Sequence, residues 1–141
     1  MMKKLSQSLE DYLEMVLMLH LSKGAVRLKD IASELHVKAP SAVRALNELK
    51  SLGYVEQEPY GLVELTPSGM TAAKSVFGRH KLLRTFLLQL GVSPEVANED
   101  ACSIEHVLSG ETLDRIESFV EKNAKKAKKA KSSAADAEVF L

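Results

Sequence analysis

Three side chains able to bind a metal ion lie close together near residue 105. Cys102, Glu105 and His106 are spaced i, i+3 and i+4 in a stretch with helical character, so a thiolate, a carboxylate and an imidazole would emerge from one helical face. A mixed set of sulfur, oxygen and nitrogen ligands suits a divalent first-row transition metal, whereas calcium and magnesium prefer oxygen alone. Glu99, one turn earlier, is a fourth ligand or a spare. The spacing therefore predicts a transition-metal site, with a solvated acidic helix face as the alternative.

Further potential ligands lie elsewhere in the chain. Asp11 and Glu14 are spaced i and i+3 in the first predicted helix, and His80 lies in a basic stretch. Each of these taken alone is also typical of a solvated helix face or of an ordinary histidine, and no single cluster is a complete cage. Considered together with Cys102, they favour a metal ion.

The net charge of zero hides a division of charge along the chain. Residues 71–90 carry 4 basic and 0 acidic side chains, whereas residues 91–121 carry 1 and 8. The acidic stretch contains the Cys102 cluster, so its charge is explained either by a solvated face or by a cation site.

The N-terminal half has the pattern of a DNA-binding domain. Apolar residues at helical spacing predict helices over 6–24, 28–35 and 40–53, and period-two alternation over 54–65 predicts a hairpin turning at 59–61. Two helices joined by a short turn and followed by a hairpin form a winged helix-turn-helix, whose second helix enters the DNA major groove.

Polar and small side chains on the third predicted helix are candidates for DNA contact. Lysine and arginine reach phosphates or guanine edges, serine takes either role, and proline contacts a thymine methyl group. The candidates are Lys38, Pro40, Ser41, Arg44 and Asn47, with Tyr60 in the wing. An ordinary polar helix face, and a tyrosine that only packs the turn, are the alternatives. Residues 23–51 hold 6 basic and 3 acidic groups, so we expect affinity to depend on dimerisation.

A second, all-helical module is predicted after the hairpin. Thr66, Pro67 and Ser68 open a long fourth helix that ends near Gly91, and two more helices follow before a Lys- and Ala-rich tail. The fold class is therefore mainly α with one small hairpin.

Composition excludes several classes of protein. The 141 residues, of which 45% are hydrophobic, suffice for one or two small cores but not for a large multidomain enzyme. No apolar run reaches the roughly 18 residues of a membrane span, and the first residues do not form a signal-peptide core. The single Cys102 permits no intramolecular disulfide. We expect a cytoplasmic protein without a membrane partner.

Three short sequence motifs resemble those of a known protein family. They are residues 11–14 (DYLE), 78–83 (GRHKLL) and 100–109 (DACSIEHVLS), within a similarity that covers about residues 5–125. The chain resembles the diphtheria toxin repressor and manganese transport regulator family of metal-dependent repressors. The resemblance implies a homodimer that binds operator DNA when metal is bound. It also implies a winged helix-turn-helix domain over 1–72, a helical metal-binding and dimerisation domain over 73–125, and a tail over 126–141.

The resemblance assigns six residues to metal-binding positions and bears on the identity of the metal. The six are Asp11, Glu14, His80, Cys102, Glu105 and His106. Asp11 is typical of manganese-responsive members and Cys102 of iron-responsive ones, while Arg84 replaces a carboxylate of the iron-type ancillary site. From the length of the chain we expect no SH3-like third domain. Cys102 thus favours Fe(II), whereas Asp11, Arg84 and the short chain favour Mn(II), and on balance we expect Mn(II) rather than Fe(II). Six ligands leave open one ion or two.

Other functions remain as alternatives. A winged-helix regulator could respond to a non-metal ligand, and a winged fold could bind protein rather than DNA. A metalloenzyme would need a positioned base and an open coordination site, but the chain has no paired-histidine motif, phosphate loop or nucleophile elbow. We therefore expect no enzymatic activity and no small-molecule substrate.

Overall fold

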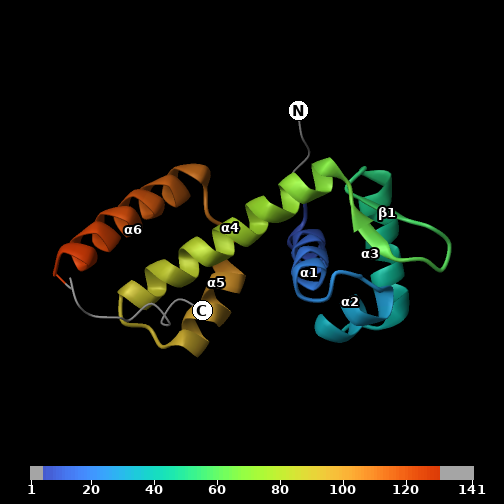
Figure 1. The fold of residues 1–141 in the computed structure, drawn as a ribbon, viewed down its shortest axis with the longest axis horizontal. Helices are drawn as coiled ribbons and strands as arrows, with labels where there is room; N and C mark the ends of the chain where they lie inside the picture. Colours follow the sequence, from blue (N-terminus) through green and yellow to red (C-terminus); the bar gives the residue numbers. More distant parts are fainter. Residues whose placement is uncertain (1–4, 131–141) are drawn as a thin grey trace. The chain divides into compact units, whose positions relative to one another are not determined.

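A computed structural model describes residues 5–130 of the chain, which form six helices and one hairpin (Figure 1). The elements are α1 (Gln7–Lys23), α2 (Leu28–Glu34), α3 (Ala39–Ser51), β1 (Val55–Gln57), β2 (Val63–Leu65), α4 (Pro67–Gln89), α5 (Pro94–Ile104) and α6 (Gly110–Ala130). The chain divides into two compact units, residues 1–77 and 78–141, and the division falls within α4. The predicted fold class is confirmed. The predicted tail over 126–141 begins inside α6, and residues 131–141 lie outside the described part.

Local capping defines the first helix. Ser6 precedes α1, and its hydroxyl oxygen accepts a hydrogen bond from the Leu9 amide at 3.2 Å. Gly24 ends the helix at φ 81°, a left-handed conformation that glycine adopts without a Cβ clash, and its N–H donates to the carbonyl of His20. Between these caps, α1 supplies more of the first unit's buried apolar residues than any other element does, including Leu13, Val16 and Leu17.

The turn between α2 and α3 brings two helices together on this core. His36 has φ 56° in the turn, and the next amide, of Val37, donates to the carbonyl of Ala32 at 2.9 Å. Helix α3 then buries Ala42, Leu46 and Leu49 at the spacing of one helical face. Because that face is apolar, the opposite face of α3 is left to solvent.

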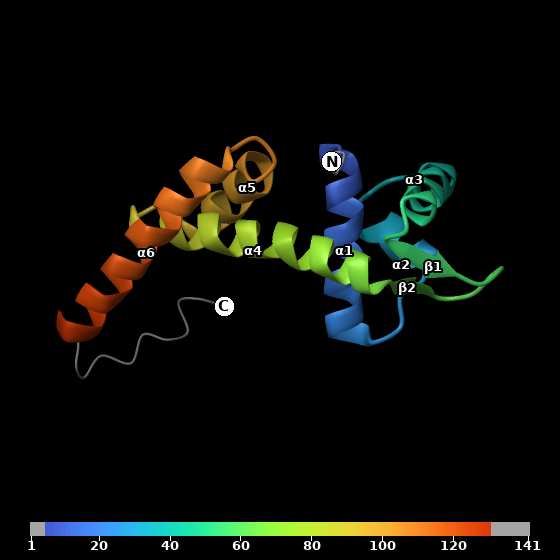
Figure 2. The same cartoon turned by 90° about the horizontal axis from the view of Figure 1, so that it is seen from above.

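The hairpin packs one side against the same core. Val55 pairs with Leu65 and Gln57 with Val63 in an antiparallel register, and both valines are buried. Figure 2 shows the hairpin extending from the three helices. The amide of Val63 also donates to the carbonyl of Val26, at 2.8 Å, which ties the wing to the loop after α1. These elements together form a winged helix-turn-helix.

A close backbone approach fixes the start of α4. The Thr66 hydroxyl accepts a hydrogen bond from the Gly69 amide at 3.0 Å and donates to the carbonyl of Gly53 at 2.6 Å. A Cβ at Gly69 would collide with the Tyr54 backbone carbonyl. Glycine is therefore required where α4 passes the beginning of the hairpin.

The second unit contains the C-terminal part of α4 together with α5 and α6. Leu83, Ala97 and Ala101 are buried, and the two small alanines lie one turn apart on α5. Phe86 of α4 and Phe119 of α6 meet edge to face, with ring centroids 5.8 Å apart. Among the described helices, none combines the length and apolar character needed to cross a membrane.

Candidate metal centre and DNA-binding face

Helix α5 ends earlier than the sequence indicated. We expected the helix to continue through His106, but its last residue is Ile104. The Glu105 amide still donates to the Ala101 carbonyl, whereas the next turn tightens, because Val107 donates to Ile104 only three residues back. The chain turns here because Ser109 already caps α6, accepting a hydrogen bond from the Thr112 amide. Glu105 keeps helical angles (φ −59°, ψ −23°), so the predicted i, i+3 relation to Cys102 survives.

Four of the six predicted ligands lie in the second unit, and their side chains meet. His80 Nδ1 lies 3.5 Å from Cys102 Sγ and 3.4 Å from Glu105 Oε2. His106 Nε2 lies 3.3 Å from the other carboxylate oxygen of Glu105. Glu105 is thus the centre of the cluster, with one imidazole beside each oxygen.

The environment of Glu105 suits a cation. Its side chain is 0% exposed, and its two carboxylate oxygens face the imidazole nitrogens of His80 at 3.4 Å and of His106 at 3.3 Å. Burying a carboxylate is unfavourable unless positive charge compensates it. A divalent ion would supply that charge, and nitrogen, oxygen and sulfur donors linked by successive contacts of 3.3–3.5 Å match a first-row transition metal. These residues therefore fit a metal ion.

His80 responds to the same negative surroundings. Hydrogen bonding to Cys102 and then to Glu105 raises the pKa of His80 to about 10, although partial burial opposes the charged form. At neutral pH and without metal, the raised pKa favours the protonated, imidazolium form of His80. Metal binding must displace this proton.

Two residues at the cluster were missed by sequence reasoning. Asn98 Oδ1 lies 3.0 Å from His80 Nε2, on the side of the ring away from Cys102 and Glu105. Arg79 Nε donates to the backbone carbonyl of Glu105 at 3.0 Å, which attaches the end of α5 to α4. The i, i+4 spacing of Asn98 and Cys102, which places both on one helical face, could have indicated Asn98. No local sequence pattern indicated the contact of Arg79.

The remaining predicted ligands lie in the first unit. Asp11 and Glu14 are one turn apart on α1, where Asp11 is half-buried and Glu14 is buried. The side chain of Glu99, considered as a further ligand, is exposed on α5.

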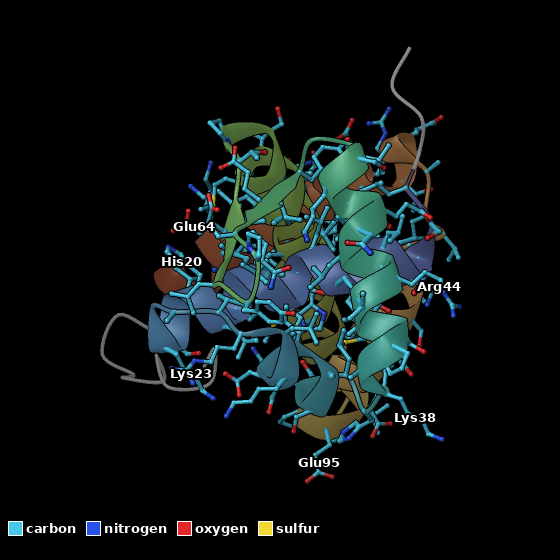
Figure 3. The ribbon with its side chains drawn as sticks, turned by 90° about the vertical axis from the view of Figure 1, so that its right-hand side faces the viewer. His20, Lys23, Lys38, Arg44, Glu64 and Glu95 are labelled. Atoms are coloured by element: carbon cyan, nitrogen blue, oxygen red, sulfur yellow. The ribbon has the colours of Figure 1, made fainter. Side chains whose placement is uncertain are left out.

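The residues predicted to contact DNA lie on the solvent side of the winged domain. All five on or before α3, and Tyr60 at the wing tip, are exposed. Figure 3 shows Lys38 and Arg44 projecting outward along α3, with Lys38 at its N-terminal end. Tyr60 is fully exposed and adopts φ 58°, so its ring is available at the tip of the wing.

The wing itself carries negative charge. Glu56 and Glu64 are directly opposite each other in the hairpin register, and both are exposed. Like charges at paired positions weaken a hairpin and would repel phosphates. On this domain the exposed positive charges of Lys38 and Arg44 therefore lie on α3 and its N-terminal flank, whereas the strands present negative charge.

Comparisons with known proteins identify both units. Residues 4–63 match the model of the iron dependent repressor N-terminal DNA binding domain, and residues 66–131 match that of its metal binding and dimerisation domain. The chain is 39% identical over 119 residues to the transcriptional regulator MntR of Salmonella typhimurium, covering 84% of this chain and 76% of that protein. It is 38% identical over 120 residues to an uncharacterized HTH-type transcriptional regulator of Methanocaldococcus jannaschii, covering 84% of this chain and 96% of the relative.

Solved structures agree with these relatives. A manganese-dependent transcriptional repressor in complex with manganese matches with a TM-score of 0.74 at 31% identity, over 80% of this chain and 52% of that one. The IdeR structure of T. acidophilum matches with a TM-score of 0.70 at 33% identity, over 82% and 54%. The chain thus spans about half the length of these solved chains. The two family models together cover nearly all of the described residues, and the chain belongs to the iron dependent repressor family of metal-dependent transcriptional repressors.

Proposed function

We propose that this protein is a Mn(II)-activated repressor that binds operator DNA as a homodimer and controls genes of metal homeostasis in the cytoplasm. The observation that carries the proposal is the fully buried Glu105 carboxylate, whose two oxygens lie within 3.4 Å of the imidazole nitrogens of His80 and His106. A bound cation would compensate the negative charge of this carboxylate. Because such binding is reversible, occupancy of the site would report the concentration of the metal ion.

The metal ligands in this proposal are the six sequence candidates. His80, Cys102, Glu105 and His106 supply nitrogen, sulfur and oxygen from the second unit. Asp11 and Glu14 are proposed on donor chemistry and on the family resemblance, because hard carboxylate oxygens suit Mn(II). Three carboxylates against one thiolate favour Mn(II) over Fe(II), and the relatives named for manganese support the same choice. Six ligands would also serve two ions.

Metal can regulate DNA binding only through a difference in its affinity for two conformations of the protein. An ion shifts a conformational equilibrium only if the DNA-binding conformation holds it more tightly than the alternative does. Without the ion, the ligand carboxylates repel one another, and with it that repulsion becomes attraction. Metal binding therefore stabilises the conformation in which all the ligands converge.

DNA contact is assigned to the exposed face of α3 and to the wing tip. Arg44 and Lys38 supply charge for phosphates or guanine edges, while Ser41, Asn47 and Pro40 face the same solvent side. Tyr60 would contact the backbone or minor groove. One α3 helix per subunit carries few basic groups, so two half-sites read by a dimer supply the affinity.

The test uses a duplex selected from a random library by the protein in Mn(II). Fluorescence anisotropy should show tight, salt-dependent binding in Mn(II) and weak binding in chelator, with light scattering reporting a dimer. Arg44→Ala should weaken binding at least tenfold. The control Lys122→Ala removes the same charge from an exposed position on α6 and should bind like the wild type. Equal binding with and without metal would contradict the proposal.

A further inference from the structure

Asn98 contacts the ring of a proposed metal ligand on the side away from the other ligands. Its Oδ1 lies 3.0 Å from His80 Nε2, while His80 Nδ1 faces Cys102 Sγ at 3.5 Å and Glu105 Oε2 at 3.4 Å. The two ring nitrogens point in opposite directions, so Asn98 cannot share with Nδ1 an ion bound at the Cys102 and Glu105 side. Asn98 can therefore affect a bound ion only indirectly, through the imidazole ring of His80.

The chemistry of the contact defines that role. An amide oxygen only accepts hydrogen bonds, so the nitrogen beside it must carry the proton. A neutral imidazole that is protonated at Nε2 presents its lone pair at Nδ1. The contact therefore selects the tautomer and ring orientation in which Nδ1 points at Cys102 and Glu105.

We propose that Asn98 is a positioning residue that holds His80 as an Nδ1 metal ligand, and so sets the affinity of the site for its activating ion. This inference rests on the proposed function, because it concerns the same metal site. It also distinguishes the residues of α5 from one another: Cys102, together with Glu105 just after the helix, would bind the ion directly, whereas Asn98, one turn before Cys102, contacts the histidine ligand from α4.

The position of Asn98 makes the inference testable. Its side chain is exposed, so replacement does not open a cavity in the core. Outer hydrogen-bond partners of ligating histidines typically change metal affinity by about 10–100-fold when removed. Asn98→Leu keeps the approximate size and removes the acceptor, whereas Asn98→Asp keeps an acceptor that cannot donate.

The experiment compares Asn98→Leu and Asn98→Asp with the wild type and with Asn123→Leu. This control makes the same substitution in α6, where Asn123 also has a side-chain hydrogen bond, to Gln89 at 3.5 Å. Calorimetric titrations with Mn(II) and Zn(II) give affinity, and nitrogen-15 spectra of the Zn(II)-loaded full chain report which nitrogen of His80 carries hydrogen. Circular dichroism checks that each variant is folded.

We expect hydrogen on Nε2 and zinc on Nδ1 in the wild type, a loss of about 10–100-fold in affinity for Asn98→Leu, and recovery in Asn98→Asp. Asn123→Leu should match the wild type. Zinc bound through Nε2, unchanged affinity in Asn98→Leu, or no recovery with aspartate would each overturn the role of Asn98 alone. A wild-type chain that bound neither ion would overturn the proposed function as well.

Discussion

The protonation of His80 gives a quantitative test of the cluster in the metal-free protein. Interaction with Cys102 and then Glu105 raises the pKa of His80 to about 10 from the ordinary 6.5. At pH 8.5 the charged form should therefore outnumber the neutral form about 30 to 1, whereas an unperturbed histidine would be about 99% neutral. Because the folded-state pKa is raised, this interaction stabilises the fold fully below about pH 6.5. The stabilisation is lost as pH rises through about 10.

Nitrogen-15 or carbon-13 spectra of histidine-labelled protein in chelator measure this titration directly. Replacement with His80→Gln assigns the signal, and Cys102→Ala and Glu105→Gln should each lower the pKa of His80, because each removes a cause of the shift. Denaturant unfolding of the wild type should show stability declining between pH 6.5 and 10, with a weaker decline in His80→Gln. A His80 signal that titrated near 6.5 in the wild type would refute the cluster geometry.

Three further substitutions test other parts of the account. Cys102→Glu replaces a thiolate by a hard carboxylate and should shift the ratio of Mn(II) to Zn(II) affinity about tenfold toward Mn(II); competition titration would contradict ligation by Cys102 if the ratio stayed constant. Gly69→Ala places a methyl group against the Tyr54 carbonyl and should lower the free energy of unfolding by about 1–3 kcal/mol, measured with urea, and wild-type stability would show that the two segments are not in close contact. His36→Gly relieves a left-handed conformation and should raise the same free energy by about 0.5–1 kcal/mol, whereas destabilisation would argue against the φ of 56°.

The winged domain could be predicted from sequence because its signals are local. Ser6 and Gly24 cap α1 at the two ends of the predicted range 6–24, and alternation located the hairpin to within a residue or two at each strand end. The burial of Val55 and Val63 follows from the same alternation. These are short-range preferences that need no knowledge of distant contacts.

The metal cluster could be predicted from the sequence only in part. Helical spacing related Cys102 to Glu105, but the end of α5 depends on where α6 begins, and periodicity places such boundaries poorly. The contacts of His80 with Asn98 and of Arg79 with the Glu105 carbonyl join separate helices. Their partners lie 18 and 26 residues apart, so no local pattern could reveal them.

The identity of the activating signal is a separate matter from the fold. Winged helix-turn-helix domains respond to many ligands, so the choice of metal over an organic ligand had to come from the second unit. The match of residues 66–131 to a metal binding and dimerisation domain supports metal over the alternative of a non-metal ligand.

The most direct test of the central claim is an anaerobic calorimetric titration with Mn(II) of the wild type, Glu105→Gln and Glu99→Gln, followed by anisotropy with the selected duplex. Both substitutions remove one negative charge from neighbouring turns of the same segment, but Glu105 is buried among histidines and Glu99 is exposed. We expect saturable binding in the wild type and Glu99→Gln, and at least a hundredfold weaker binding in Glu105→Gln, with loss of metal-dependent DNA binding. Equal Mn(II) affinity in all three proteins would contradict the claim.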